Sequence, residues 1–588
     1  MTELFEPVGD HDRRLALGAD GLLAVFNVAG VLEAGDVHVA GRVADLAAET
    51  DERVLLAAAL AVRAVRSGSV CVDLTTIASL APELPWPEPD AWVAALLGSR
   101  LVAEGVLRHE GSLTYLDRYH RLETQVAADL LTRAGADAPT VDESALAAAL
   151  ARVRGDHLSP EQEAAAEGAV RRWTTVLTGG PGTGKTTTVA RMLVLLADQA
   201  AAAGRRCSIA LAAPTGKAAT RLQEAVLGEL AGLDPADQER VGRPDAMTLH
   251  RLLGFRHDNR TRFRHDRANR LKYDVVVVDE CSMVELTMMG RVLEAVRPEA
   301  RLLLVGDPRQ LTSVGAGAVL ADVVRGFEGH PTSPVASLTE NFRSTEDIKD
   351  LAEALRVGDA DAVLATLRRA SDEVEFVETD DPAAALREDA LASALAVREA
   401  AVAGDHERAL AALDGHRLLC AHREGPFGVR HWNAQVERWV AEETGVPIYT
   451  SWYVGRPVLV TTNDYALGVY NGESGVAVLQ PDGRLRVWIA GSESVRDLAP
   501  GRLEAIETMH AMTIHKSQGS QAERVTVLLP EAGSRLLTRE LFYTAVTRAQ
   551  SRVRVVGSEE AVRAAVATQA QRATGLRLRL HGAGGSSR

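Results

Sequence analysis

The segment that decides the fold is Thr175-Val176-Leu177-Thr178-Gly179-Gly180-Pro181-Gly182-Thr183-Gly184-Lys185-Thr186-Thr187. It predicts a buried strand, a glycine-rich turn and the start of a helix, and it fits the pattern G-x-x-x-x-G-K-[ST]. Backbone N–H groups of such a turn surround phosphate oxygens, and the helix dipole adds to the attraction. Lys185 should reach the β- and γ-phosphates of ATP, and the Thr186 hydroxyl should ligate Mg²⁺. The predicted nucleotide-binding residues of the turn are Gly179, Gly180, Pro181, Gly182, Thr183, Gly184, Lys185, Thr186 and Thr187.

The residues around this turn predict an α/β domain with a parallel sheet. Apolar runs at 208–213, 275–278 and 302–305 alternate with helical patterns, as expected for strands that are buried on both faces. Polar groups follow each run, and ligands of such sheets bind at the C-terminal ends of the strands. Upstream, Ser159 predicts a helix start, and Gln162 could read the edge of an adenine with its amide.

Two carboxylates, Asp279 and Glu280, follow the second of these strands. One carboxylate in this position can hold Mg²⁺, often through water, and the next can orient or deprotonate the attacking water. Gln310 follows the third strand, where its amide could sense the γ-phosphate. The sequence therefore predicts a site that hydrolyses ATP, with Thr186 and Asp279 as the metal ligands.

The second half of the chain predicts another α/β domain with a β insertion. Apolar runs at 417–421, 524–529 and 553–556 are typical of buried strands. Short strands joined by the tight turns Asn471-Gly472 and Asp482-Gly483 predict a small β-barrel inserted between them.

The N-terminal part is rich in Ala and Leu and predicts helices, with a hairpin around Glu110-Gly111. The expected organisation is a helical N-terminal domain at 1–150, a first α/β domain at 151–345 with a basic hairpin at 251–272, a second α/β domain at 346–449 and 501–575, a β insertion at 450–500 and a disordered tail at 576–588.

Composition excludes several classes of protein. The four cysteines lie far apart without a C-x-x-C pair, which argues against a zinc site, an iron–sulfur cluster or a disulfide framework. No apolar run reaches the ~18 residues of a membrane span, and the acidic start is unlike a targeting peptide, so we expect a cytoplasmic protein.

The net charge of −15 excludes a uniformly basic nucleic-acid binder but not a local basic channel. Residues 251–272 carry basic side chains interleaved with Phe255 and Phe263 and are a candidate phosphate-backbone surface.

These motifs, in this order, resemble those of superfamily 1 helicases over residues 158–557. Motif II of that family commonly has Ala where this chain has Cys281. Beside the phosphate loop, the matching segments are Ala213-Pro214-Thr215-Gly216-Lys217, Thr248-Leu249-His250, Asp279-Glu280-Cys281-Ser282-Met283, Gly306-Asp307-Pro308-Arg309-Gln310-Leu311, Thr513-Ile514-His515-Lys516-Ser517-Gln518-Gly519 and Tyr543-Thr544-Ala545-Val546-Thr547-Arg548.

Within superfamily 1B, the chain resembles the RecD family of exodeoxyribonuclease V (RecBCD) subunits. The resemblance implies two RecA-like motor domains, an SH3-like fold for the β insertion, and 5′→3′ movement on single-stranded DNA. It also implies RecB-like and RecC-like partners that join it in processing double-strand ends for recombinational repair, with nuclease activity supplied by a partner. The segments that carry it are Asp279-Glu280-Cys281-Ser282-Met283, His422-Arg423-Glu424-Gly425-Pro426-Phe427-Gly428, Asn463-Asp464-Tyr465-Ala466-Leu467-Gly468 and Arg118-Tyr119-His120-Arg121-Leu122-Glu123.

The family pattern also implies roles for individual residues. Lys185, Asp279, Glu280 and Gln310 would act at the ATP site of the first motor domain. Two arginines, Arg343 and Arg548, would complete that site from the far domain. The residues implied to line the DNA are Pro214, Thr215, Lys217, Thr248, His250, His515, Lys516 and Ser517.

Three other interpretations stay open at this stage. A stand-alone RecD-like helicase would carry a longer N-terminal extension with helix-hairpin-helix repeats, which residues 1–150 do not show. A P-loop ATPase switch without unwinding activity would not need the second sheet with its own Thr547-Arg548. A structural subunit with a vestigial ATPase is disfavoured because every expected catalytic position is filled.

The N-terminal part has apolar helical stripes but no catalytic residues, as at Val54–Val62. Such stripes predict a docking surface, and the resemblance implies that the partner bound there is RecC-like.

Overall fold

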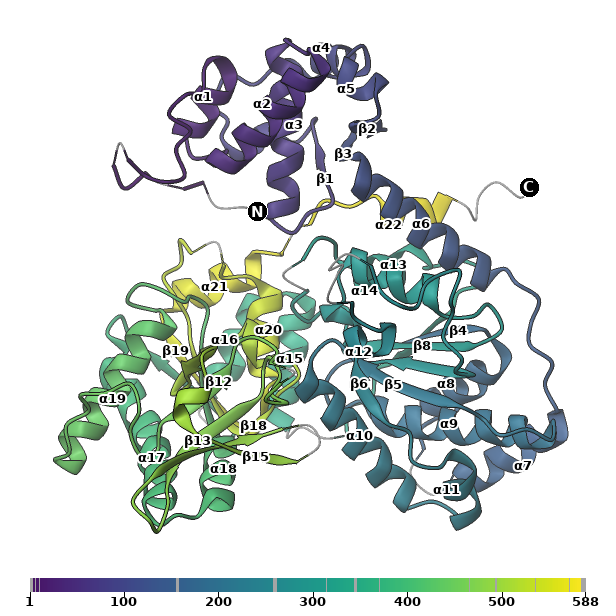
Figure 1. Ribbon diagram of the computed structural model, residues 1–588, viewed down its shortest axis with the longest axis vertical. Helices are drawn as coiled ribbons and strands as arrows, with labels where there is room; N and C mark the ends of the chain where they lie inside the picture. Colours follow the sequence, from purple (N-terminus) through teal and green to yellow (C-terminus); the bar gives the residue numbers. More distant parts are fainter. Residues whose placement is uncertain are drawn as a thin grey trace.

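The chain forms an N-terminal domain and two larger domains, each built on a parallel sheet (Figure 1). The N-terminal domain lies above the other two in this view, and the C-terminal residues return to it from the second large domain. The computed structural model describes residues 4–5, 7–9, 11–154, 158–256, 262–312, 315–342, 346–369, 371–464, 466–491, 494–534, 536–570 and 572–582.

The N-terminal domain packs helices around a small antiparallel sheet. The predicted hairpin is confirmed as β2 and β3, and Gly111 makes its turn with a φ of 62°. Phe26, Leu60 and Trp92 are buried in a core that belongs to this domain alone. Its elements are α1 (Gly21–Val28), α2 (Ala34–Ala47), α3 (Glu52–Arg66), β1 (Cys71–Asp73), α4 (Pro89–Leu97), α5 (Arg100–Ala103), β2 (Leu107–Glu110) and β3 (Leu113–Leu116).

Helices α6 (Asp117–Ala134) and α7 (Glu143–Arg154) pack on the first large domain, although we expect residues 1–150 to form one unit from the sequence. On α6, Val126 and Leu130 share a core with the first parallel sheet, and α7 packs on α9 (Lys185–Ala202) of the same domain. The packed N-terminal domain therefore ends before α6. An amphipathic stripe shows that a helix has a buried face but not which domain covers it.

All neighbouring strands of the first large sheet are parallel, as predicted. Their order is β6 (Ala246–Thr248), β5 (Ile209–Ala213), β7 (Val275–Val278), β8 (Arg301–Gly306), β4 (Thr174–Gly179) and β9 (Val335–Leu338). The helices of this domain are α8 (Pro160–Arg171), α9 (Lys185–Ala202), α10 (Gly216–Ala231), α11 (Pro235–Val241), α12 (Leu249–Leu253), α13 (Leu286–Ala295) and α14 (Val319–Gly326).

Strand β7 shows why the runs of this sheet are apolar throughout. Val276 and Val278 enter the core under α6, α13 and α14, whereas Val275 and Val277 enter the core under α8, α9 and α10. Side chains of a strand alternate between the two faces, so both faces must be apolar when helices cover both. The C-terminal ends of β4, β7 and β8 consequently place their polar groups at one edge.

The second large domain repeats this plan with a parallel sheet in the order β10 (Val374–Glu378), β19 (Ala549–Gly557), β18 (Ala522–Leu528), β11 (His416–Cys420) and β17 (Ala511–Thr513). Its helices are α15 (Glu346–Val357), α16 (Ala360–Arg368), α17 (Pro382–Val402), α18 (His406–Gly415), α19 (Val429–Thr444), α20 (Arg539–Val546) and α21 (Glu559–Ala567).

The β insertion is an antiparallel sheet in the order β15 (Val495–Leu498), β14 (Leu485–Ala490), β13 (Ser474–Leu479), β12 (Pro457–Val460) and β16 (Ile506–Thr508). It continues past the expected boundary at residue 500. Among the described residues no ladder joins β15 to β16, so these two strands are edges of an open sheet. The barrel form and the SH3-like assignment stay predictions.

The end of the chain differs from the disordered tail expected at 576–588. Residues Leu576–Gly582 form helix α22, with Leu576 and Leu580 buried in the core of the first large domain. The sequence pattern suggested disorder because this helix is short and next to a glycine- and serine-rich end. None of the helices that the structure describes has the length and apolar character needed to cross a membrane.

Candidate nucleotide-hydrolysis site

The phosphate loop connects β4 to α9 and depends on two glycines with positive φ. Gly182 and Gly184 have φ values of 80° and 76°. A Cβ atom on Gly184 would lie 2.2 Å from Nε2 of Gln162, so this position excludes a side chain. Gln162 itself is buried at the start of α8, where its Nε2 donates to the Thr183 carbonyl at 3.2 Å. Its amide therefore supports the loop, while the adenine-reading role stays a prediction.

Lys185 opens α9 with its ammonium buried in the loop. Its Nζ donates to the carbonyl oxygens of Gly179 and Gly180 at 2.8 Å each. Burial lowers the pKa of Lys185, and the negative charges of Asp307, Asp279 and Glu280 oppose that shift. These carbonyl partners are weak acceptors compared with phosphate, so the ammonium is positioned to exchange them for phosphate oxygens.

The carboxylates that follow β7 occupy a strained turn. Glu280 has a φ of 51°, one of two non-glycine residues with positive φ among those described. Such left-handed conformations cost about 1–3 kcal/mol and persist where the surroundings impose them. Burial, and then the charge of Glu280, raise the pKa of Asp279 to about 7. A cation at this site would relieve the repulsion between the two carboxylates.

Residues of both large domains meet at the end of β8. Nη2 of Arg548 donates to Oε1 of Gln310 at 2.9 Å, and the Tyr543 hydroxyl donates to Asp307 at 3.0 Å. Next to Gln310, the amide of Leu311 donates to the Thr544 hydroxyl at 2.8 Å. The predicted role of Arg548 as a group supplied by the second domain therefore agrees with its position.

Lys185, the two carboxylates after β7, Gln310 and Arg548 line one cavity of about 610 Å³ at the C-terminal edge of the first sheet. The second domain contributes Arg548 to its wall, and the end of the first domain contributes Phe342, whose amide donates to the Gly182 carbonyl at 2.8 Å. The other predicted finger, Arg343, lies outside the described residues. The predicted site residues that border the cavity are Pro181, Gly182, Gly184, Lys185, Thr186, Thr187, Asp279, Glu280, Gln310 and Arg548.

The donor set of this cavity fits a nucleotide with Mg²⁺. The hydroxyl of Thr186 and the carboxylate of Asp279 border the same space as the Lys185 ammonium, which provides hard oxygen ligands beside a cation for phosphate. Mg²⁺ is typically held by one or two protein oxygens plus substrate phosphates and water. These two residues are the ones that would hold the metal.

Four of the residues implied to line DNA gather at a second, smaller cavity between the domains. Thr215, Lys217, His515 and Lys516 line about 130 Å³ next to the β insertion. Burial, and then the charge of the neighbouring Arg417, lower the pKa of Lys217 to about 7. Lys217 is therefore partly buried, with its Nζ 3.5 Å from the Ser474 hydroxyl of the β insertion.

The remaining residues implied to line DNA do not share that cavity. Thr248 lines a larger cavity of about 690 Å³ with Phe255, and His250 lies with its ring centroid 5.7 Å from that of Phe263. Pro214 is partly buried at the end of β5. Ser517 is turned inward, since its hydroxyl donates to the Ile514 carbonyl at 2.7 Å.

The basic segment 251–272 is less free than its composition suggests. Arg267 pairs with Asp129 of α6 at 2.7 Å, and Arg270 donates to the Val296 carbonyl at 2.6 Å. Phe255 and Phe263 form the antiparallel bridge of a hairpin whose residues 257–261 lie outside the described part. Its predicted contact with nucleic acid stays a prediction.

Sequence reasoning missed several residues of the nucleotide cavity. Asp307 and Tyr543 both stand inside the quoted motifs, yet their pairing across the domain interface has no local signal. Burial, and then Asp307, raise the pKa of Tyr543, which keeps its hydroxyl a donor. Glu229 of α10 accepts a hydrogen bond from Thr187 at 2.8 Å, and no spacing in the sequence points to it.

Three family models match parts of the chain. A model described as "AAA domain" matches residues 162–316, and one described as "UvrD-like helicase C-terminal domain" matches residues 508–556. A third, "RecBCD enzyme subunit RecD, N-terminal domain", matches residues 28–111.

Whole-chain relatives agree with these models. The chain is 56% identical to "RecBCD enzyme subunit RecD" of Mycobacterium tuberculosis over 97% of this chain and 99% of the relative. It is 58% identical to the protein of that name from Mycolicibacterium smegmatis, over 96% and 100% of the two chains. "ATP-dependent RecD2 DNA helicase" of Deinococcus radiodurans is 33% identical over 82% of this chain and 60% of its own length. A solved Pif1 helicase from Candida albicans matches 68% of this chain and 94% of its own at 16% identity and a TM-score of 0.39, too distant to carry an argument.

We predict that Gly184→Ala weakens nucleotide binding by about tenfold or more. A left-handed alanine is strained by about 1–2 kcal/mol, and its Cβ would displace Gln162, which supports the loop. Titration with a fluorescent ATP analogue measures the effect. Gly35→Ala on α2, where a Cβ would meet no neighbour within 4 Å, is the matched control and should bind as the unmodified chain does. Equal affinities for the two variants would contradict the proposed geometry.

Proposed function

Because the chain belongs to the RecD family of RecBCD enzyme subunits, we propose that it is an ATP-driven motor that moves 5′→3′ along single-stranded DNA. It works with RecB-like and RecC-like subunits on double-strand ends, and the nuclease activity comes from a partner. The observation that carries the motor function is the contact between Arg548 of the second RecA-like domain and Gln310 of the first, at the nucleotide cavity. Hydrolysis at such a site depends on the position of one domain relative to the other. This dependence couples ATP hydrolysis to movement of the domains.

Each charged residue of the cavity then has a defined task. Lys185 compensates the charge of the β- and γ-phosphates, and Thr186 and Asp279 hold Mg²⁺, which when bound supplies further positive charge to the phosphates. Glu280 orients the attacking water, and Arg548 stabilises the charge that develops on the transferred group. Gln310, bonded to Arg548, would report on the presence of the γ-phosphate.

The predicted test of this chemistry is Glu280→Gln. The amide cannot accept the proton of the attacking water, so DNA-stimulated ATP turnover should fall about 10²-fold or more, while nucleotide binding persists. Steady-state hydrolysis and nucleotide titration measure the two effects. Glu299→Gln, an exposed change on the same domain, is the control. Near-normal turnover in Glu280→Gln would remove Glu280 from this role.

The Glu507 carboxylate is bonded to two cationic side chains that we expect to face DNA. Glu507 accepts from Nζ of Lys516 at 2.6 Å and from Nη2 of Arg423 at 2.8 Å. Burial acts to raise the pKa of Glu507, but the contacts with Lys516 and Arg423 hold it below its ordinary value. A DNA phosphate must therefore compete with this carboxylate for both cations, which also line a cavity of about 250 Å³ with Asn433.

We predict that Glu507→Gln tightens binding of single-stranded DNA and steepens its salt dependence by up to about one unit of slope, because two cations become available to phosphate. Fluorescence anisotropy of a labelled oligonucleotide at several salt concentrations measures both quantities. Glu504→Gln, an exposed change three residues away, should alter neither. Lys516→Ala should act in the opposite direction. Weaker or unchanged binding by Glu507→Gln would show that Lys516 and Arg423 do not meet phosphate.

The N-terminal domain offers an apolar surface for the partner subunits, but not the one expected from the sequence. Val54, Leu56 and Leu60 of the predicted docking helix are buried in the domain's own core, so that expectation was wrong. The large apolar side chains that are exposed among the described residues of this domain lie elsewhere, at Val8 and Leu17, at Val25 and Val28 of α1, at Val39 and Leu46 of α2, and at Leu97 of α4.

We predict that Val28→Asp and Leu46→Asp together reduce co-purification with the RecB-like and RecC-like subunits but leave DNA-stimulated ATPase unchanged. Each side chain is more than half exposed, at 66% and 72%, so the changes should not disturb folding. Val402→Asp, an exposed apolar position at the end of α17, is the control. If the unmodified chain runs alone when co-expressed with those subunits, a stand-alone helicase, as the name of the Deinococcus relative describes, becomes the better assignment.

A further inference from the structure

The last residues of the chain cross from the second motor domain to the other two domains. We call residues 568–570 and 572–582 the C-terminal strap. In Figure 1 this yellow segment leaves the side of α21 and reaches α22, which lies beside α6 below the N-terminal domain. The strap therefore touches every domain of the molecule.

At its first end the strap is bonded to the start of α20 in the second motor domain. The amide of Arg539 donates to the Thr568 carbonyl at 2.8 Å. The amide of Ala570 donates to the Glu540 carboxylate, also at 2.8 Å. These two bonds hold the first turn of α20 to the strap.

At its other end the strap is bonded to the first motor domain and the N-terminal domain. Nη1 of Arg572 donates to the Gly315 carbonyl at 2.6 Å, in the loop that follows Gln310 and Leu311. Its guanidinium lies against Gly68, where a Cβ atom would be 3.0 Å from Cζ. The amide of Val70 donates to the Ala573 carbonyl at 2.8 Å.

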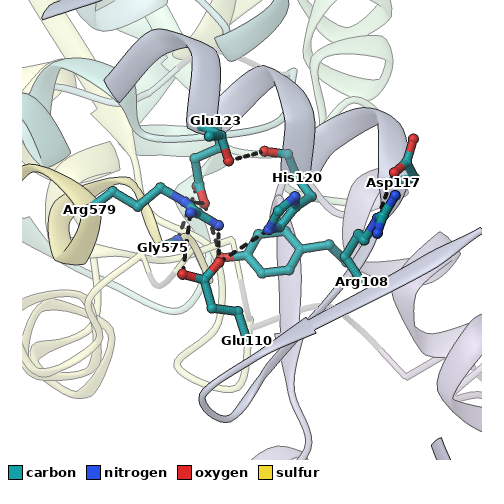
Figure 2. A network of polar contacts seen from close by, with 9 residues as sticks. Arg108, Glu110, Asp117, His120, Glu123, Gly575 and Arg579 are labelled. Atoms are coloured by element: carbon teal, nitrogen blue, oxygen red, sulfur yellow. Dashed lines mark hydrogen bonds and ion pairs between the residues drawn. The ribbon is translucent and has the colours of Figure 1, made fainter. Parts of the chain in front are cut away.

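A buried carboxylate fastens the rest of the strap (Figure 2). Glu123 of α6 is fully buried and accepts from the Thr574 hydroxyl at 2.6 Å, the Gly575 amide at 3.0 Å and the Tyr115 hydroxyl at 3.0 Å. Arg579 of α22 provides the compensating charge and also pairs with Glu110. A buried carboxylate with this many donors is costly to uncover, so the strap is held firmly.

Helix α20 is consequently tied to the first motor domain at both ends. Its last turn is bonded directly, through Tyr543 to Asp307 and through Thr544 to Leu311, and Arg548 follows it. Among the described residues, hydrogen bonds connect its first turn to that domain only by way of the strap. Ala570 and Arg572 are separated by one residue, so their Cα atoms can be at most about 7 Å apart. Only the Glu540 and Arg572 side chains add to the length of the connection.

We propose that the strap is a positioning element for Arg548, with Arg572 and Glu123 as its positioning residues. The proposal rests on the ATP-driven function assigned above. By joining the start of α20 to the first motor domain through three residues of chain and two side chains, the strap permits rotation of the second domain but not its separation. Arg548 therefore returns to the same place beside Gln310 in each cycle of opening and closing.

The test lengthens the strap without removing either anchor. Six residues of glycine and serine are inserted between Ala570 and Gln571 of the full-length chain. The kcat of DNA-stimulated ATP hydrolysis should fall about tenfold to hundredfold, because displacements of about 1 Å at a reacting group cost up to ~10²-fold. The KM for ATP should change by less than twofold, since the phosphate loop is untouched. The same insertion after Gly582 is the control and should leave kcat unchanged.

Point variants separate positioning from folding. Arg572→Ala should lower kcat in the same way, and Arg572→Lys, whose ammonium can still donate to the loop carbonyls, should restore part of it. Arg577→Ala, an exposed change on α22, should have no effect. Thermal unfolding and protease resistance of the strap show whether it stays docked.

A normal kcat in the protein with the lengthened strap would overturn the proposal. So would a loss of kcat accompanied by an equal rise in KM and a lower unfolding temperature, which marks a general structural role. A different result would contradict the assigned ATP-driven function itself. That result is an unmodified chain that does not hydrolyse ATP, or one whose hydrolysis is unaffected by Glu280→Gln.

Discussion

The hydrogen bond between Arg548 and Gln310 joins the two motor domains inside the nucleotide cavity. It can form only while the two domains are packed against each other. Arg548 is buried, and its guanidinium also donates to the Thr544 and Ser520 carbonyls at 3.2 and 3.3 Å. A buried cation must have its donors satisfied, so this arginine can occupy its place only while the domains are in contact. The cavity is thereby a property of the pair of domains rather than of the phosphate loop alone.

The same interface connects the nucleotide cavity with the predicted DNA surface. Leu311, next to Gln310, accepts from the Gln518 amide at 2.5 Å through its carbonyl and donates to Thr544 through its own amide. Gln518 follows directly on the turn that carries His515 and Lys516. Through this contact, a shift of the loop around Gln310 would be passed to the turn that carries His515 and Lys516, which lines the cavity between the domains.

The N-terminal domain and the C-terminal strap form the outer part of this arrangement. Helix α6 belongs to the first motor domain by its packing, yet its Glu123 receives the strap and the N-terminal Tyr115 at the same point (Figure 2). Burial, and then the charge of Glu123, raise the pKa of the nearby Asp322 to about 7. Charged groups are thus concentrated where three parts of the chain meet.

The sequence by itself determined the phosphate loop, the parallel sheets and the carboxylates that follow β7, because each depends on neighbours in the chain. Gly184 must have positive φ, Val275–Val278 must be apolar on both faces, and Asp279 must stand at a strand end. The tertiary structure alone decided that Lys217 is partly buried beside the β insertion and that Glu507 forms an ion pair with Lys516. It also decided that α6 joins the first motor domain and that the chain end is a docked strap. Most of these outcomes follow from contacts between residues far apart in the chain, such as Glu123 and Thr574, which are 451 positions apart. Glu507 and Lys516 are nine positions apart, but they belong to different elements, on either side of β17. The local sequence determines which chemical groups a segment carries and which face of a helix or strand they lie on. The partner that buries or neutralises each group is determined only when the domains pack.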